Sequence, residues 1–378
     1  MENIVYLDNS ATTKPCKKTI EYMNYSLEEN WGNPSSLHSL GIRAEEKLVS
    51  CKEACASLLS CRSDEIYFTG SGTEANNLAI TGGVRARAKR GNRIVTTAAE
   101  HPSVLNTIKH FEAQGFEVIY LKPERNGAIS KESIKNAIND KTIFVSIMLV
   151  NNETGAINPV AYAKEVIKSV GCPALLHCDA VQGFGKMEVK PSLLGVDLLS
   201  FSGHKIHGPK GIGVLYRKKG LHILPQILGG GQQEGLRSGI EPMPLICGLN
   251  GALTELCDIK GQYEKTKALW EYAKSSLDAL PFVKINSTDE GLPYILNISV
   301  VGYRSETILH FLDALGVFVS SGSACAKGEL SHTLMAMGLN KREIDSAIRI
   351  SFSRYNTYED IDRLVSGLKE ATEKLKRV

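Results

Sequence analysis

Short apolar runs alternate with amphipathic stretches through the first two thirds of the chain. The runs predict strands at 65–68, 93–97, 117–121, 142–150, 174–178, 197–202 and 213–217. Between several of them, apolar positions at helical spacing predict helices at 74–88, 103–114 and 160–170. Alternation of this kind predicts an α/β fold, with a mostly parallel central sheet covered by helices on both faces.

The pattern changes near residue 256. The rest of the chain predicts a charged amphipathic helix at 261–280, strands at 294–301, 317–321 and 347–353, and helices at 306–315 and from residue 358 onward. This is typical of a smaller α+β domain. A length of 378 residues also favours about two domains. Because no Pro-, Gly- or Ser-rich linker separates them, we expect the two domains to pack against each other.

Composition narrows the classes of function. The 44 Lys and Arg residues nearly balance the 41 Asp and Glu residues, which gives no support for nucleic-acid binding. The longest apolar run, 143–150, is much shorter than the ~20 residues of a membrane span, and the first residues do not resemble a secretory signal. Nine scattered cysteines favour a cytoplasmic protein with reduced thiols and no metal site. Cys51 and Cys55 lie four residues apart on a helical stretch, so we expect them to be packing residues and not metal ligands.

The segment 197–216, DLLSFSGHKIHGPKGIGVLY, places Lys205 in a loop between two apolar strands. Open α/β sheets bind ligands at the carboxyl ends of their strands. A lysine held there can lose its proton and form a Schiff base with an aldehyde. Taken alone, Lys205 would also fit a solvated loop lysine.

Three other strand ends carry polar residues. In FTGSGTEANNLAI, the residues 70–73 end a strand and open a helix, which favours a phosphate ligand or a plain turn with Thr73 as the N-cap. Asp179 in HCDAVQ could keep a pyridinium nitrogen protonated or could cap a turn. His101 in AAEHPSV could cap a helix, or stack on a ring and transfer protons.

Cys325 lies in the segment VSSGSACAKGE among serine, glycine and alanine residues. Such neighbours offer nothing large to bury a thiol, so we expect the side chain to be accessible. An accessible thiolate in this setting is a plausible nucleophile.

Together these segments resemble the cysteine desulfurases of the NifS/IscS group, which belong to the class V family of pyridoxal-phosphate (PLP) aminotransferases. The resemblance runs from YLDNSATT to AIRISFSRYNTYEDID, through WGNPSSLH, EHPSV, VNNETG, GGGQQEGLRSG and SSGSAC. It implies the fold of type I PLP-dependent transferases and a homodimer. It also implies a PLP-binding large domain at 14–255, and a small domain, made of 1–13 and 256–378, that carries the cysteine loop.

The resemblance implies a role for each matching residue. Lys205 would form the Schiff base, Cys325 would carry a persulfide, and His101 would stack on the cofactor ring and assist proton transfer. Asp179 would pair with the pyridine nitrogen, and Gln182 would face the phenolic oxygen. The remaining roles are phosphate binding by Gly72, Thr73, Ser202 and His204, and binding of the substrate carboxylate by Arg349 and by Asn152, which would also contact the cofactor.

Two departures from the family pattern concern the glycine-rich segment. Where many relatives read RSGT, this chain reads RSGI, so Ile240 cannot donate the hydrogen bond that the threonine makes to the partner subunit's phosphate. GGGQQEG also replaces GGGQERG, which places Glu234 where relatives have arginine. In addition, the stretch after Cys325 is slightly shorter than in relatives that serve a scaffold protein, so the resemblance does not identify the sulfur acceptor.

The activity implied by the resemblance is removal of sulfur from L-cysteine. L-Alanine would leave, and a persulfide on Cys325 would deliver sulfur to an acceptor protein for iron–sulfur clusters or thio-cofactors. The alternatives are a selenocysteine lyase or another class V PLP enzyme and, in a different class, a non-catalytic partner protein that keeps the fold. A nucleotide-binding oxidoreductase is disfavoured because no GxGxxG follows the first strand.

Overall fold

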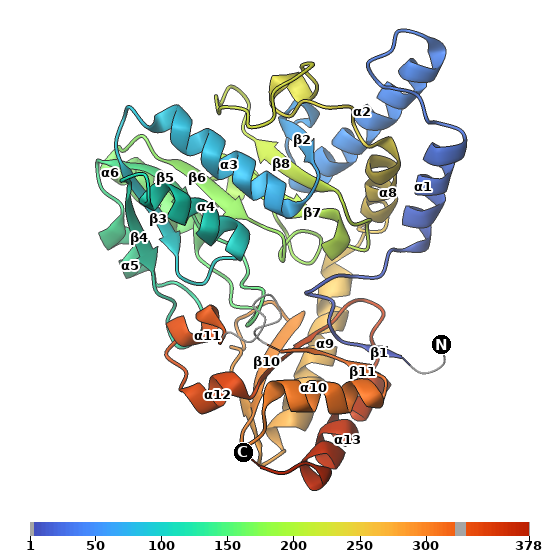
Figure 1. The fold of residues 1–378 in the computed structure, drawn as a ribbon, viewed down its shortest axis with the longest axis vertical. Coiled ribbons are helices and arrows are strands. Elements are labelled where there is room, and N and C mark those ends of the chain that lie inside the picture. Colours follow the sequence, from blue (N-terminus) through green and yellow to red (C-terminus); the bar gives the residue numbers. More distant parts are fainter. Residues whose placement is uncertain (1–3, 322–329, 378) are drawn as a thin grey trace.

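The computed structural model describes residues 4–321 and 330–377, and its largest element is a seven-stranded sheet (Figure 1). The strand order is β2-β8-β7-β6-β5-β3-β4; β8 pairs antiparallel with both β2 and β7, and the other pairs are parallel. The prediction of a mostly parallel sheet is therefore confirmed. The strands are β2 (Ile66–Thr69), β3 (Arg93–Thr97), β4 (Glu117–Leu121), β5 (Thr142–Ser146), β6 (Leu175–Asp179), β7 (Leu198–Ser202) and β8 (Gly213–Arg217).

Each face of this sheet has its own hydrophobic cluster. Val95 and Val145 belong to the cluster on one face, and their chain neighbours Ile94 and Phe144 belong to the cluster on the other. Successive side chains of a strand point to opposite faces, so a strand covered on both sides needs apolar residues at every position. This explains the unbroken apolar runs in the sequence.

Helices cover both faces. One face carries α3 (Gly72–Arg87), which crosses β5 to β8 and packs against α4 (Pro102–Glu112). The cluster on the other face includes residues of α2, α5, α6 and α8, and Cys51 and Cys55 of α2 are buried in it, as predicted. The remaining elements of this part are α1 (Lys17–Glu28), α2 (Ser39–Leu59), η1 (Ser63–Glu65), α5 (Lys131–Ala137), α6 (Val160–Val170), α7 (Pro191–Leu194), η2 (Gly203–Lys205), η3 (Gln233–Gly235) and α8 (Met243–Leu253), where η is a 3₁₀ helix.

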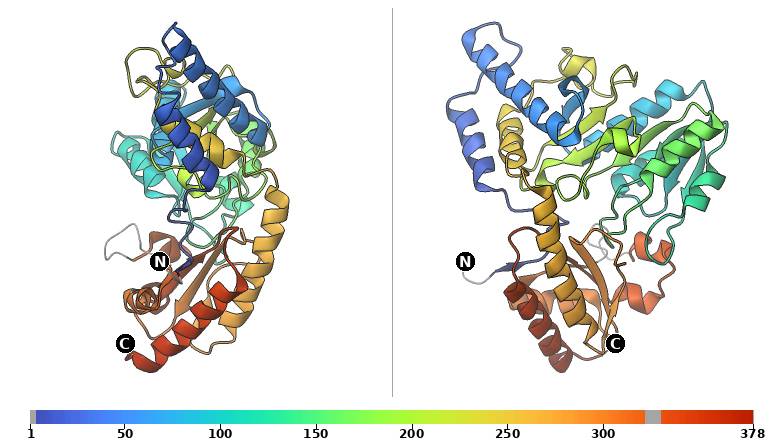
Figure 2. Two further views of the ribbon diagram at one scale, coloured as in Figure 1. Left: turned by 90° about the vertical axis from the view of Figure 1, so that its right-hand side faces the viewer. Right: turned by 180° about the vertical axis from the view of Figure 1, so that it is seen from behind.

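The chain beyond α8 forms a second, four-stranded sheet with the order β12-β13-β10-β9. Helix α9 (Ile259–Asp278) connects the two parts, because Tyr263 packs on the first core whereas Trp270 packs on the second (Figure 2). The elements are β9 (Val283–Ile285), β10 (Ile295–Val300), α10 (Ser305–Ala314), β11 (Val317–Phe318), β12 (Ser320–Ser321), α11 (His332–Ala336), α12 (Lys341–Asp345), β13 (Ala347–Ser351) and α13 (Tyr358–Lys374).

The start of the chain joins this second part. Strand β1 (Val5–Tyr6) pairs in parallel with β11, whereas β12 pairs with β13. The prediction of one strand at 317–321 was therefore wrong, because its two halves have different partners. The predicted strand 142–150 also ends early, at Ser146. Beyond it, the Met148 N–H donates to the Glu100 carboxylate, since β3 has already ended.

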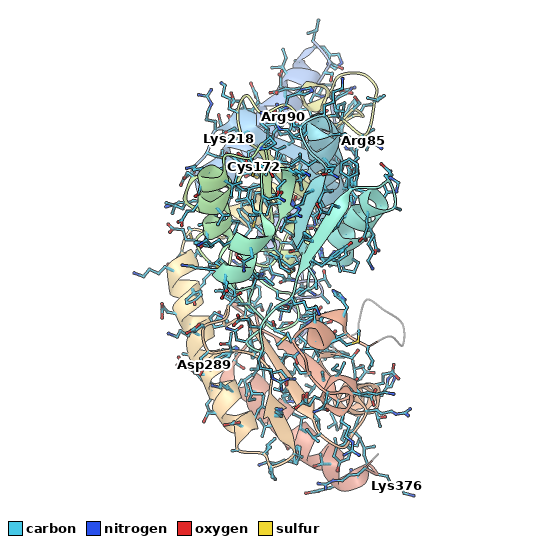
Figure 3. The ribbon with its side chains drawn as sticks, turned by 90° about the vertical axis from the view of Figure 1, so that its left-hand side faces the viewer. Arg85, Arg90, Cys172, Lys218, Asp289 and Lys376 are labelled. Carbon is cyan, nitrogen blue, oxygen red and sulfur yellow. The ribbon has the colours of Figure 1, made fainter. Side chains whose placement is uncertain are left out.

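Charged side chains lie on the outside of both parts. Arg85, Arg90 and Lys218 are exposed around the seven-stranded sheet, and Asp289 and Lys376 are exposed on the second part (Figure 3). Within residues 4–321 and 330–377, no helix is long and apolar enough to span a membrane.

Candidate active site

A cavity of about 370 Å³ lies at the carboxyl ends of the parallel strands. Because parallel strands end at the same edge of a sheet, residues far apart in sequence meet there. The cavity is lined by all of the predicted site residues that the structure describes: Gly72, Thr73, His101, Asn152, Asp179, Gln182, Ser202, His204, Lys205 and Arg349. Cys325 lies outside the described residues.

Lys205 ends the short helix η2, directly after β7. Its Nζ donates to the backbone oxygens of Ser10 at 2.5 Å and Ala11 at 2.7 Å. Both acceptors belong to the DNSATT segment, which follows β1. The segment is held near the cavity because Asp8 forms a bridge to Ser351 at the end of β13. The amine of Lys205 is thus fixed at the cavity wall instead of extending into solvent.

Asp179 is the last residue of β6, and its carboxylate is fixed on both sides. Oδ1 accepts the Val181 N–H at 3.0 Å, and Oδ2 accepts a hydrogen bond from Asn76 Nδ2 at 2.7 Å. Asn76 also donates to Ser103 Oγ at 3.0 Å. Helix α3 therefore positions Asp179 as much as its own strand does.

His101 caps α4 and also lines the cavity. Its Nδ1 accepts the Ser103 N–H at 3.1 Å, so the proton of the neutral ring resides on Nε2. Burial lowers the pKa of His101, Asp179 opposes that effect, and Lys205 and His332 lower the pKa further. The imidazole is therefore neutral around pH 7.

The N-terminus of α3 opens onto the cavity. The N-cap is Ser71, whose side chain accepts the Glu74 N–H at 3.1 Å, and not Thr73. A Cβ at Gly72 would lie 3.1 Å from Val181 Cγ2 and 3.3 Å from Ser202 Cβ, which is tighter than ordinary contact. Glycine at this position lets the helix start close to β7, and it leaves backbone N–H groups facing a space suited to an anion.

His204 lies on the same side of the cavity as Lys205. Its Nδ1 is 3.2 Å from Thr12 Oγ1. Burial, followed by the nearby cations, lowers the pKa of His204 to about 4. The ring is therefore a neutral hydrogen-bonding group at physiological pH.

Arg349 enters the cavity from β13 and has only 7% of its side chain exposed. Nη2 contacts Asp8 Oδ1 at 2.8 Å, and Nη1 donates to the Asn152 backbone oxygen at 3.1 Å. Within the described residues, Nε is buried without a hydrogen-bond partner. The guanidinium is held rigidly and retains donor capacity for a carboxylate.

Several polar residues that sequence reasoning missed support this cavity. The Ser331 hydroxyl donates to Glu153 at 2.5 Å, and His332 Nε2 lies 3.0 Å from the Glu100 backbone oxygen. Burial raises the pKa of Glu100 to about 8. The signal was present in EHPSV and VNNETG, where an acidic residue adjoins a predicted site residue at the end of an apolar strand.

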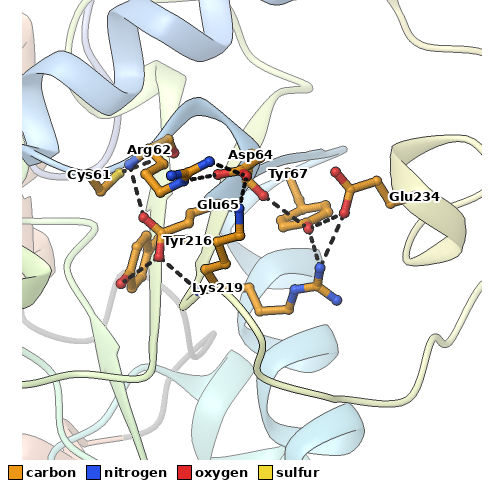
Figure 4. A network of polar contacts seen from close by, with 9 residues as sticks. Cys61, Arg62, Asp64, Glu65, Tyr67, Tyr216, Lys219 and Glu234 are labelled. Carbon is orange, nitrogen blue, oxygen red and sulfur yellow. Dashed lines mark hydrogen bonds and ion pairs between the residues drawn. The ribbon is translucent and has the colours of Figure 1, made fainter.

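The Glu234 departure has a structural role within its own chain. Glu234 Oε2 accepts the Tyr67 hydroxyl at 2.7 Å and pairs with Arg217 at 3.3 Å (Figure 4). Next to it, Gln233 Oε1 accepts the Phe68 N–H at 3.0 Å. These bonds attach the glycine-rich segment to β2 and β8.

A wider groove of about 720 Å³ along α3 and α4 shares Thr73, His101 and Ser103 with the cavity. The described residues that line it include no lysine and no carboxylate. The chemistry is therefore assigned to the smaller cavity, where Lys205 and Asp179 lie.

Comparison with known proteins identifies the family. Residues 5–364 match the family model described as aminotransferase class-V. The chain is 40% identical to the cysteine desulfurase IscS of Clostridium botulinum over 376 residues. The aligned region covers 97% of this chain and 94% of that protein. A solved NifS-like protein has a TM-score of 0.93 at 35% identity, covering 99% of this chain and 100% of that one.

A further solved structure, SspA in complex with cysteine, has a TM-score of 0.82 at 32% identity and covers 93% of this chain and 99% of that one. The likeness to these proteins extends over 93% or more of the chain. The chain therefore belongs to the class-V aminotransferase family and, within it, to the NifS/IscS group.

Proposed function

We propose that this chain is a PLP-dependent cysteine desulfurase that releases L-alanine from L-cysteine and holds the sulfur as a persulfide on Cys325. One observation carries the proposal: Lys205, Asp179 and Arg349 line a single cavity. They provide an amine for an aldehyde, a carboxylate for a ring nitrogen and a guanidinium for an amino-acid carboxylate. Relatives named as cysteine desulfurases, and a related structure with cysteine bound, support this activity and this substrate.

The polar atoms of residues that line the cavity indicate that it can hold the cofactor. Within the described residues, Ser10 Oγ, Asn76 Oδ1 and Arg349 Nε are buried without partners, and all three residues line the cavity. Buried polar atoms normally form hydrogen bonds, so these atoms favour a polar ligand. When bound, PLP supplies an aldehyde that condenses with amines and a ring that accepts electron density.

Each side of the cavity would hold a different part of that cofactor. Lys205 would hold the aldehyde carbon, Asp179 the ring nitrogen and Gln182 the phenolic oxygen. The neutral ring of His101 would lie against the cofactor ring. The phosphate would be held at the N-terminus of α3 and beside η2, by Gly72, Thr73, Ser202 and His204.

The residues of the chain would then divide the work on L-cysteine. Arg349 and Asn152 bind the carboxylate and fix the orientation of the Cα–H bond. The amine of Lys205 takes the Cα proton and returns it to the product, and His101 assists through its neutral imidazole. The Cys325 thiolate attacks the substrate sulfur, so that an S–S bond forms and the C–S bond breaks. One cysteine and one protein thiol thus give one alanine and one persulfide.

The proposal includes a homodimer in a reducing compartment such as the cytoplasm. Large apolar side chains are exposed on α1 and α2, between these two helices, and in the glycine-rich segment that precedes α8, and such exposure is typical of interaction surfaces. They include Ile20, Leu27, Trp31, Leu37, Ile42, Leu228 and Ile240. A second copy of the chain would cover them and bring its glycine-rich segment to the phosphate end of the cavity. The persulfide would then pass to an acceptor protein.

Borohydride reduction tests the site. Purified protein loaded with PLP is reduced, digested and analysed by mass spectrometry, and PLP should be attached to Lys205. Lys205→Ala should lose the visible absorbance and the release of alanine. Lys210→Ala, at an exposed position of the same loop, should keep both. PLP on another lysine, or alanine release by Lys205→Ala, would refute the proposal.

A further inference from the structure

A second lysine lies buried beside the cavity, and the mechanism above does not use it. Lys186 is 6% exposed. Its Nζ donates to Gln182 Oε1 at 3.0 Å and lies 5.8 Å from the centroid of the Tyr294 ring. The charged groups that act on it, within the part of the chain that the structure describes, are the cations Lys205 and Arg349. Lys186 is therefore a buried amine without a carboxylate to balance it.

A chain of hydrogen bonds connects Lys186 with Lys205. Gln182 accepts from Lys186 through Oε1 and donates through Nε2 to the Ser10 backbone oxygen at 3.0 Å. The same oxygen accepts from Lys205 Nζ at 2.5 Å. In its charged form Lys186 only donates, and the ammonium group then determines which end of the Gln182 carboxamide faces Ser10. A flipped carboxamide would place two donors against each other.

A buried amine of this kind opposes folding. Burial, with the nearby cations Lys205 and Arg349, lowers the pKa of Lys186 to about 7. The other titratable rings that face it are His204 and His207, and burial lowers the pKa of each to about 4. Arg354 and Tyr294 line the same small space. None of the described residues that line this space is acidic, so the buried charge is uncompensated, and an uncompensated buried charge is typical of a functional site.

We propose that Lys186 is a positioning residue for the Lys205 site. Its amine fixes the Gln182 carboxamide, and its positive charge disfavours a second positive charge on the nitrogen of Lys205. Lys205 is thereby kept ready to act as a base and nucleophile. This inference rests on the proposed function only because it takes Lys205 to be the residue that carries the cofactor.

A pH titration of the visible absorption tests this role in the protein loaded with PLP. Lys186→Met removes the amine and approximates its shape. The midpoint of the titration should rise by about one pH unit or more, because loss of a nearby cation and loss of the fixed carboxamide both favour the protonated chromophore. Lys186→Arg keeps the charge and should remain closer to the wild-type midpoint. Lys190→Met, in the same segment but paired with Glu188 at 2.6 Å, should leave the midpoint unchanged.

Thermal unfolding of the apoprotein separates this role from a packing role. The folded-state pKa of Lys186 is below the unfolded value, so the cost of burying its charge is largest below about pH 7 and disappears as the pH approaches 10.5. Lys186→Met should therefore keep or raise the melting temperature of the apoprotein, most clearly at or below pH 7. A lower melting temperature with an unmoved midpoint would identify a packing residue and overturn the proposal.

Three other outcomes are decisive. Equal shifts in Lys186→Arg and Lys186→Met would refute the role of the charge. Wild-type protein that forms no visible chromophore with PLP would refute the proposed function. A normal wild-type chromophore with an unmoved midpoint in Lys186→Met would refute only the role of Lys186.

Discussion

Arg349→Ala is the most informative perturbation of substrate binding. The guanidinium is held from two sides before any substrate arrives, by Asp8 at 2.8 Å and by the Asn152 backbone oxygen at 3.1 Å. Because it is already ordered, little side-chain entropy remains to be lost when a carboxylate binds. Alanine would remove the donors and would leave Asp8 without its cation, close to the position of the substrate carboxylate.

The magnitude follows from the charge-assisted pair that is lost. Truncation of one partner in such a pair costs ~2–4 kcal/mol. Since about 1.4 kcal/mol corresponds to a factor of ten, the KM for L-cysteine should rise at least about tenfold. PLP should stay bound, because the other cofactor contacts come from the seven-stranded part. Arg349→Lys keeps a charge without the planar pair of donors, so its KM should lie between that of the wild type and that of Arg349→Ala.

The assay is alanine release as a function of L-cysteine concentration, with visible absorbance as the check on cofactor content. Reduced cofactor content would show that the variant has lost more than substrate binding, and its KM would then be measured at saturating PLP. An unchanged KM in Arg349→Ala with full cofactor content would rule out Arg349 as the carboxylate site.

Three further changes test other contacts of the cavity. Asn76→Ala removes the donor to Asp179 Oδ2, so PLP should bind several-fold more weakly in an absorbance titration; equal affinity would contradict the supporting role of α3. Ile240→Thr should tighten PLP binding several-fold, because a neutral hydrogen bond contributes ~0.5–1.5 kcal/mol and Ile240 is 64% exposed on its own chain. A monomer in light scattering would refute the shared site behind that expectation. Glu100→Gln should stabilise the protein more at alkaline than at acidic pH, because burial of the Glu100 carboxylate makes the wild-type protein less stable as the pH rises from 4.5 through the folded-state pKa of about 8. Equal gains in melting temperature at acidic and alkaline pH would refute this expectation.

The strands of the large sheet could be predicted from the sequence because both of their faces are buried. Phe144 and Val145, which point to opposite clusters, are both apolar, so β5 contains an unbroken apolar run at 143–145. The run at 317–321 misled for the opposite reason. Its two halves pair with β1 and β13, and no local pattern reveals that partners distant in sequence divide a short run.

In the candidate site, too, the sequence identifies some residues, whereas others become visible only in the folded chain. Asp179 and Lys205 could be identified because each is a polar residue at the end of an apolar strand. Asn76 lies inside a helix, and its importance depends on a bond to Asp179 that only the folded chain creates. Lys186 resembles a surface lysine in the sequence, and its burial follows from packing against Tyr294 and Gln182.

The proposed function depends on transfer of sulfur from L-cysteine to Cys325. The most direct test exposes wild-type and Cys325→Ser protein, both loaded with PLP, briefly to L-cysteine without added thiol, then maps persulfides by mass spectrometry and quantifies alanine. The wild type should carry a persulfide on Cys325 and release alanine in proportion to it. Cys325→Ser should bind PLP and L-cysteine normally but give no persulfide and almost no alanine, because a hydroxyl is a far poorer nucleophile toward sulfur. A persulfide on another cysteine, or undiminished alanine release by Cys325→Ser, would refute sulfur transfer to Cys325.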